Sequence, residues 1–293
     1  MILKDDQSRN RVFSKLDAIR DVPTLPTIAL RAAEIANDEA SSARELANFI
    51  SQDQALTATL LTMTNAAAYG VAGKVATVDR AVILMGFEKV RTMVLLSSAS
   101  NFFAGESDCL DRASLWRHSI GTATAAEVLA RGEAGIDPAA AYIAGLLHEV
   151  GIVILDRYFH DDLRAAVEAA LAQKSTIDRV LRDRVGFDQF RVGGYLAHRW
   201  HLPGALASSI GLHNYPPKAC GSSRVIAIVH LASMIADACC MNYEPFAVAR
   251  PVSPNAVEQL DMTPRKVMAT ADELRNQRAS IDAFVDLCTR RAA

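Results

Sequence analysis

Four polar side chains in the second half of the chain are of the types that bind divalent metal ions. They are His118, His148, Glu149 and His213. Imidazole and carboxylate groups bind zinc, iron and manganese, and such an ion can activate a water molecule for hydrolysis. A hydrolase with two cations needs several histidines and carboxylates in one pocket, yet most of the carboxylates are missing here. The pattern therefore leaves two alternatives: a metal site, or polar residues that hydrogen-bond one another in the core.

Helices must position these residues, because the sequence shows no convincing strand alternation. Asp137 and Pro138 form a strong helix start, with Asp as the N-cap and Pro at the first helical position. The apolar stretch 139–155 follows and contains His148 and Glu149. Because these two polar residues interrupt it, we expect a buried core helix and not a membrane span.

Capping residues and apolar spacing predict helices along the rest of the chain. A short helix opens at Thr77 and stops at Gly86, and a longer one follows over 87–103. The polar break at 105–108 is predicted to join two helical lobes. Later helices are predicted over 161–173, 176–185, 188–200, 203–212, 223–241 and 264–290.

Composition limits the class of protein. The chain has 293 residues, of which 51% are hydrophobic, so a sizeable core is expected. Its formal net charge is −2, which argues against nucleic acid as the main partner. The five cysteines include no C-x-x-C pair and indicate reduced thiols in a cytosolic protein. The polar N-terminus shows no signal peptide.

Several motifs of the chain occur in a characteristic order. In the first half they are Val-Pro-Thr-Leu-Pro at 22–26 and the segments 43–57, 60–70 and 81–87. The second half adds His118, Leu-Leu-His-Glu at 146–149 and Trp-His-Leu-Pro at 200–203. Taken in order, these segments resemble the HDOD domain, a bacterial signalling module related to the HD and HD-GYP phosphohydrolases. The resemblance implies an all-α fold of two helical lobes and a regulatory role.

The resemblance also shows which ligands of an HD-type metal site are present. In HD enzymes the ligands are a histidine, a His-Asp doublet and a later aspartate. His118 and His148 match the first two positions, and Glu149 replaces the aspartate of the doublet. Glutamate is one methylene longer than aspartate, so its oxygens would lie elsewhere.

Other positions depart from the enzyme pattern. Ile152 stands where HD-GYP enzymes carry a lysine, and Gln189 where a further histidine is expected. His213 matches the first residue of a tandem-histidine motif. The final aspartate aligns on Ser233, with Asp237 one turn further along the helix.

We therefore predict an all-α, two-lobed HDOD-like domain with a C-terminal helical extension. The predicted divisions are a helical lead over 1–21, a domain over 22–238 and the extension over 239–293. Within the domain, the lobes cover about 22–105 and 106–238.

The predicted function is a non-catalytic, cytoplasmic regulatory module of bacterial signal transduction that binds a partner protein or a small ligand. The alternative is a divergent metal-dependent phosphohydrolase acting on a nucleotide or cyclic dinucleotide. His118, His148, Glu149 and His213 would then be a vestigial site for Fe, Mn or Zn. No catalytic residue and no other cofactor are assigned. Membrane and nucleic acid are not expected as partners, and a homo-oligomer stays open.

A partner surface is expected around 65–71 and 78–87, where small and apolar residues cluster beside turns. Tyr69 could serve either that surface or the core. Helix–turn–helix spacing at 77–96 carries little positive charge, so lobe packing is favoured there over DNA binding. The amphipathic tail 264–290 is expected to pack on its own domain, with a partner or dimer helix as the alternative.

Overall fold

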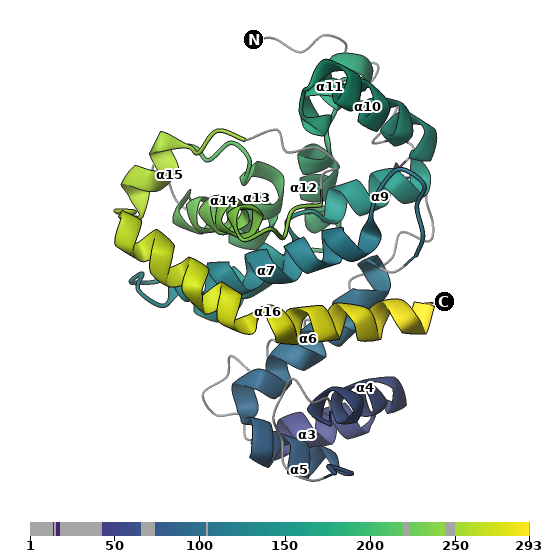
Figure 1. Cartoon of the computed structure of the whole chain (residues 1–293), viewed down its shortest axis with the longest axis vertical. Helices are drawn as coiled ribbons and strands as arrows, with labels where there is room; N and C mark the ends of the chain where they lie inside the picture. Colours follow the sequence, from purple (N-terminus) through teal and green to yellow (C-terminus); the bar gives the residue numbers. More distant parts are fainter. Residues whose placement is uncertain are drawn as a thin grey trace. The chain divides into compact units, whose positions relative to one another are not determined.

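The structure is a computed structural model, and it describes residues 14, 16–17, 43–65, 74–103, 105–218, 223–243 and 250–292. The described residues contain helices and no strand, so the predicted all-α fold is confirmed (Figure 1). The chain divides into two compact units. The smaller comprises Pro23–Gly105 and Gln277–Ala293, and the larger comprises Met1–Val22 and Glu106–Asn276. The residue boundaries predicted for the lead, domain and extension stay a prediction.

In the described part of the smaller unit, four helices of segment 43–103 pack against one another. They are α3 (Ala43–Ser51), α4 (Gln54–Thr64), α5 (Val78–Met85) and α6 (Phe87–Phe103). Thr77 caps α5 by accepting a hydrogen bond from the Arg80 amide, as the sequence predicted. Gly86 then separates α5 from α6 with a φ of 81°, which favours glycine. Most of segment 65–71, including Tyr69, lies outside the described residues.

The larger unit carries the predicted metal-binding residues. Its helices are α7 (Arg112–Ala130), α8 (Pro138–Leu147), α9 (Val150–Tyr158), α10 (His160–Gln173), α11 (Ile177–Val185), α12 (Gln189–Arg199), α13 (Gly204–Leu212), α14 (Ser223–Ala238) and α15 (Pro254–Gln259). The last helix, α16 (Pro264–Ala292), contributes residues to both units. Helix α7 packs against α8 and α14, and α9 packs against α12. These contacts bring the middle of α7 and the polar residues between α8 and α9 into one core.

The structure contains two helices where the sequence predicted one. The sequence indicated a single core helix over 139–155, but the structure ends α8 at Leu147 and begins α9 at Val150. The break falls at Glu149, whose backbone (φ −100°, ψ 17°) leaves the helical region. The stretch Pro138–Tyr158 is long and apolar enough to cross a membrane, but 83% of its apolar 18-residue window is buried inside the protein, as in a core helix. His148 and Glu149 thus lie at a turn between two buried helices.

Candidate metal centre

His118 and His148 face each other in the core of the larger unit. His118 comes from the middle of α7 and His148 directly follows α8. Both are 1% exposed, and their Nε2 atoms lie 3.1 Å apart. The His148 Nδ1 atom is 2.6 Å from the Gly145 carbonyl oxygen. Since a carbonyl can only accept, His148 donates through Nδ1 and leaves Nε2 as an acceptor.

Helix α14 and the residues directly after it place three oxygen atoms around His118. The His118 Nδ1 atom lies 3.1 Å from the Met241 carbonyl oxygen and 3.1 Å from Asp237 Oδ1. Ser233 Oγ is 3.3 Å from His118 Nε2. Both candidates for the final ligand position therefore contact this histidine, with Asp237 on its outer nitrogen and Ser233 on its inner one. A serine hydroxyl brings no negative charge to the side that faces His148.

His213 completes the cluster from the end of α13. Its ring centroid lies 4.8 Å from that of His148, and its Nε2 atom is 4.0 Å from Glu149 Oε1. His213 donates through Nδ1 to backbone carbonyls of α13, each at 3.2 Å. The structure thus brings all four predicted site residues together. By contrast, His198 and His201 do not share a helix face, because α12 ends at Arg199 and His201 has a φ of 56°.

A buried arginine side chain lies beside Glu149, and no sequence motif predicted this contact. Arg250 is 7% exposed at its side chain, and its Nη1 atom lies 3.6 Å from Glu149 Oε1. Its guanidinium also donates to the Tyr243 hydroxyl at 3.5 Å and lies 5.9 Å from the centre of the Phe190 ring. The carboxylate that would bridge two cations in an enzyme is therefore neutralised by a side chain of the same protein.

Gln189 opens α12 beside this cluster. It is 1% exposed, and neither atom of its amide group has a hydrogen-bond partner among the described residues. A buried unpaired amide is costly, so it marks a position whose surroundings are built for another side chain or a ligand. The resemblance to HD enzymes places a histidine here, and the amide brings neither imidazole nor negative charge.

Burial and the charge of Arg250 keep His148 and His213 neutral. Burial lowers the pKa of His148 well below its usual value, and the neighbouring His213 and His118 lower it further. Burial and the charge of Arg250 lower the pKa of His213 to about 3. Burial alone would raise the pKa of Asp237, but the hydrogen bond with His118 outweighs it and lowers that pKa. Neutral imidazoles can coordinate a metal, and they also tolerate a nearby cation.

These donors do not suit a pair of metal ions. His118, His148 and Glu149 place ligand atoms within 4.8 Å of one another, so they could hold a single cation such as Fe, Mn or Zn. A second cation needs a bridging carboxylate and further anionic ligands. Glu149 faces Arg250, and Gln189 and Ser233 supply no charge. The chemistry of a two-metal hydrolase therefore does not fit this pocket.

The sequence matches a known protein family and a curated relative. The family described as HDOD domain matches residues 22–216. A curated relative, an uncharacterized protein of Treponema pallidum (strain Nichols), is 27% identical over 218 residues. That match covers 73% of this chain and 41% of the relative, so the chain spans about two fifths of the relative's length.

Two solved structures share the fold. The first is an HDOD domain protein of unknown function from Geobacter sulfurreducens, with 26% identity, a TM-score of 0.78, and coverage of 95% of this chain and 96% of that one. The second, from Marinobacter aquaeolei VT8, is named "Putative signal transduction protein". It has 19% identity and a TM-score of 0.78, and the match covers 96% of this chain and 65% of that one. At 19% identity this second likeness concerns the fold alone.

Proposed function

Because the chain belongs to the HDOD family, we propose that it is a non-catalytic regulatory module of bacterial signal transduction. The chain is a signalling-related domain of the HD type. As a module it would work in the cytoplasm and bind a partner protein or a small ligand. The alternative, a metal-dependent phosphohydrolase acting on a nucleotide or cyclic dinucleotide, requires cations that Arg250 opposes.

The observation that carries this proposal is the buried pair of Glu149 and Arg250. Two unit charges of the same sign at short range repel strongly in a protein interior. A divalent cation bound to Glu149 would meet the guanidinium, which lies 3.6 Å from the same carboxylate. The charge of Glu149 is balanced by Arg250 without a metal ion. The pocket therefore stabilises the fold, and the signalling partner binds at the protein surface.

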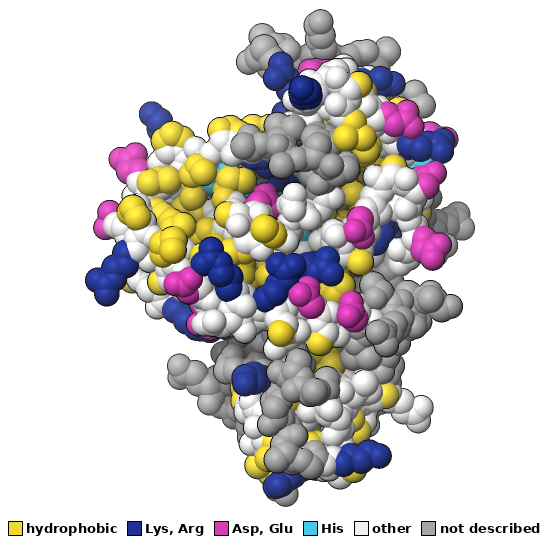
Figure 2. All heavy atoms as spheres, viewed as in Figure 1, with side chains coloured by type: hydrophobic (Ala, Val, Ile, Leu, Met, Phe, Trp, Pro, Cys, Tyr) yellow, Lys and Arg dark blue, Asp and Glu magenta, His cyan; other side chains and the backbone are white. Residues whose placement is uncertain are grey.

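Helix α5 offers a surface for a partner protein. Ile83 is 72% exposed and Leu84 is 40% exposed on this helix, although its other face is buried through Val78, Ala81 and Val82. Large apolar side chains that remain exposed side by side favour protein binding. Apolar side chains also gather over α15 and the adjoining part of α16 (Figure 2), where Met268 is 55% exposed. We assign the partner-binding site to the exposed face of α5 with Ile83 and Leu84.

Replacing Ile83 with Asp is expected to reduce capture of the partner from an extract of the native host. The side chain makes little contact within its own helix bundle, so the melting temperature should stay within a few degrees of wild type. Quantitative mass spectrometry of proteins retained by the tagged chain measures the loss. Met268→Asp is the matched control, since it adds the same charge to another exposed apolar position. Equal retention by the Ile83 variant and wild type, or loss only with Met268→Asp, would contradict the assignment.

A further inference from the structure

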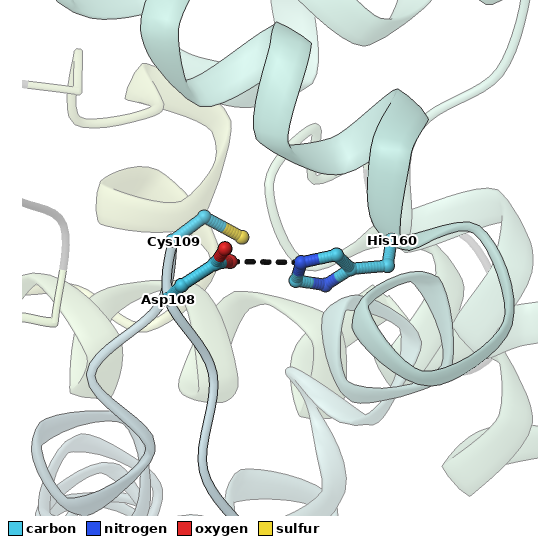
Figure 3. A group of neighbouring side chains, drawn as sticks. All are labelled: Asp108, Cys109 and His160. Atoms are coloured by element: carbon cyan, nitrogen blue, oxygen red, sulfur yellow. Dashed lines mark hydrogen bonds and ion pairs between the residues drawn. The ribbon is translucent and has the colours of Figure 1, made fainter.

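A second group of ligand-type side chains lies where the segment before α7 meets the start of α10. Asp108 and Cys109 precede α7, and His160 is the first residue of α10. Their ligand atoms all lie within 4.8 Å of one another. Figure 3 shows the Asp108 carboxylate and the Cys109 sulfur beside the His160 ring. The three residues are half-buried or exposed, so an ion in solution can reach them.

A buried carboxylate orients the His160 ring. The His160 Nδ1 atom lies 2.9 Å from Asp156 Oδ1, whose side chain is 2% exposed. Arg112 holds the other Asp156 oxygen through Nη2 at 2.6 Å and Nε at 2.7 Å. Since an ionised carboxylate only accepts, His160 donates through Nδ1 and presents Nε2 to the remaining residues. Histidine ligands of zinc are commonly held by a carboxylate in this way.

The outer side of the ring faces two further donors. His160 Nε2 lies 2.8 Å from Asp108 Oδ1, a hydrogen-bond distance, so in the metal-free protein Nε2 also carries a proton and donates it to this carboxylate. The Cys109 sulfur is 3.6 Å from Ser107 Oγ and 3.8 Å from Asp156 Oδ1, which places it at the same cluster. Ligand atoms around a tetrahedral zinc ion lie about 3.2–3.8 Å apart, given bonds of about 2.0–2.3 Å. Small side-chain rotations would give that geometry.

We propose that Asp108, Cys109 and His160 bind a thiophilic divalent cation, and that zinc fits this donor set best. Thiolate, imidazole and carboxylate groups are the three side-chain ligands of protein zinc sites. Harder cations such as magnesium avoid thiolate, and the single carboxylate here gives them little. Water completes the tetrahedron. The ion fastens the segment before α7 to α10, within the larger unit.

Binding is accompanied by loss of the cysteine proton. Burial raises the pKa of the Cys109 thiol, so the metal-free protein holds a thiol at neutral pH. A metal ion displaces that proton and the proton on His160 Nε2, both of which pass to solvent, and the sulfur binds as thiolate. The site in the core around His148 contains no cysteine, so a metal–thiolate signal distinguishes the two locations.

Cobalt(II) titration of the full-length, metal-free protein tests this proposal. We expect one equivalent to give a thiolate-to-cobalt charge-transfer band in the near ultraviolet, and zinc to displace it. Cys109→Ser should abolish the band and weaken zinc binding more than about tenfold in competition with a chromophoric chelator. His160→Asn should weaken it similarly, and its amide can still donate to Asp156, so the fold is kept. Circular dichroism melts check each variant.

Cys240→Ser is the matched control, because Cys240 is an exposed thiol elsewhere in the larger unit. It should leave the band and the zinc affinity unchanged. Absence of any thiolate–cobalt band in wild type would overturn the proposal. So would a band that survives in Cys109→Ser, and so would zinc affinity that is unchanged in a folded His160→Asn variant.

Discussion

Replacing Arg250 with Ala is expected to lower the free energy of unfolding by about 3–5 kcal/mol. The substitution leaves Glu149, which is 0% exposed, without the guanidinium that lies 3.6 Å from it. Removing one partner of a buried ion pair leaves an uncompensated charge in the core, and this costs far more than the loss of a surface pair. Denaturant unfolding followed by circular dichroism measures the change.

Two further variants make this result specific. Arg275→Ala removes an arginine whose side chain is 53% exposed and whose partner Asp272 is also exposed, so it should change stability by less than about 1 kcal/mol. Glu149→Gln combined with Arg250→Met removes both charges and should recover most of the lost stability. A loss below about 1 kcal/mol for Arg250→Ala would mean that the guanidinium does not balance Glu149.

Replacing Gly151 with Ala is expected to destabilise the larger unit by about 3 kcal/mol. A Cβ atom at this position would lie 1.8 Å from the Gln189 carbonyl oxygen and 2.7 Å from the Gly193 nitrogen. Both are backbone atoms, so α9 and α12 would have to move apart. Because Glu149 precedes α9 and Gln189 opens α12, the same movement would disturb the site.

Gly204→Ala serves as the control for this substitution. Gly204 begins α13, and a Cβ atom there would meet nothing within 4 Å. We expect a change within about 1 kcal/mol of wild type, since alanine also favours the helix. Thermal melts of the two variants under one condition give the comparison. Equal melting temperatures would show that α9 and α12 are not in the close contact described.

Much of the helical fold could be predicted because its signals are local. Asp137, Thr77 and Asp188 cap helices where the sequence placed their starts. The end of α8 could not be predicted from a local capping signal, because 139–155 is apolar throughout except at His148 and Glu149. The break there depends on what these two side chains meet in the core.

Only those residues of the candidate site that lie in recognisable sequence motifs could be predicted. His118, His148, Glu149 and His213 were identified from the ordered HDOD motifs, and the structure brings them together. Arg250 follows from no motif, because it lies far from Glu149 in the sequence and reaches it only through tertiary packing. Tertiary packing likewise brings His160 to Asp108 and Cys109, which no motif connects to it.

Hydrolysis measurements on the purified protein test the central claim most directly. Wild type and His148→Asn are compared on bis(p-nitrophenyl) phosphate and on cyclic dinucleotides, with manganese or ferrous iron added. The asparagine amide can keep the hydrogen bond to the Gly145 carbonyl but removes Nε2, so the variant should fold and lack the ligand. We predict that wild type hydrolyses these substrates no faster than the variant does. Metal-dependent turnover by wild type that is lost in a folded His148→Asn variant would contradict it.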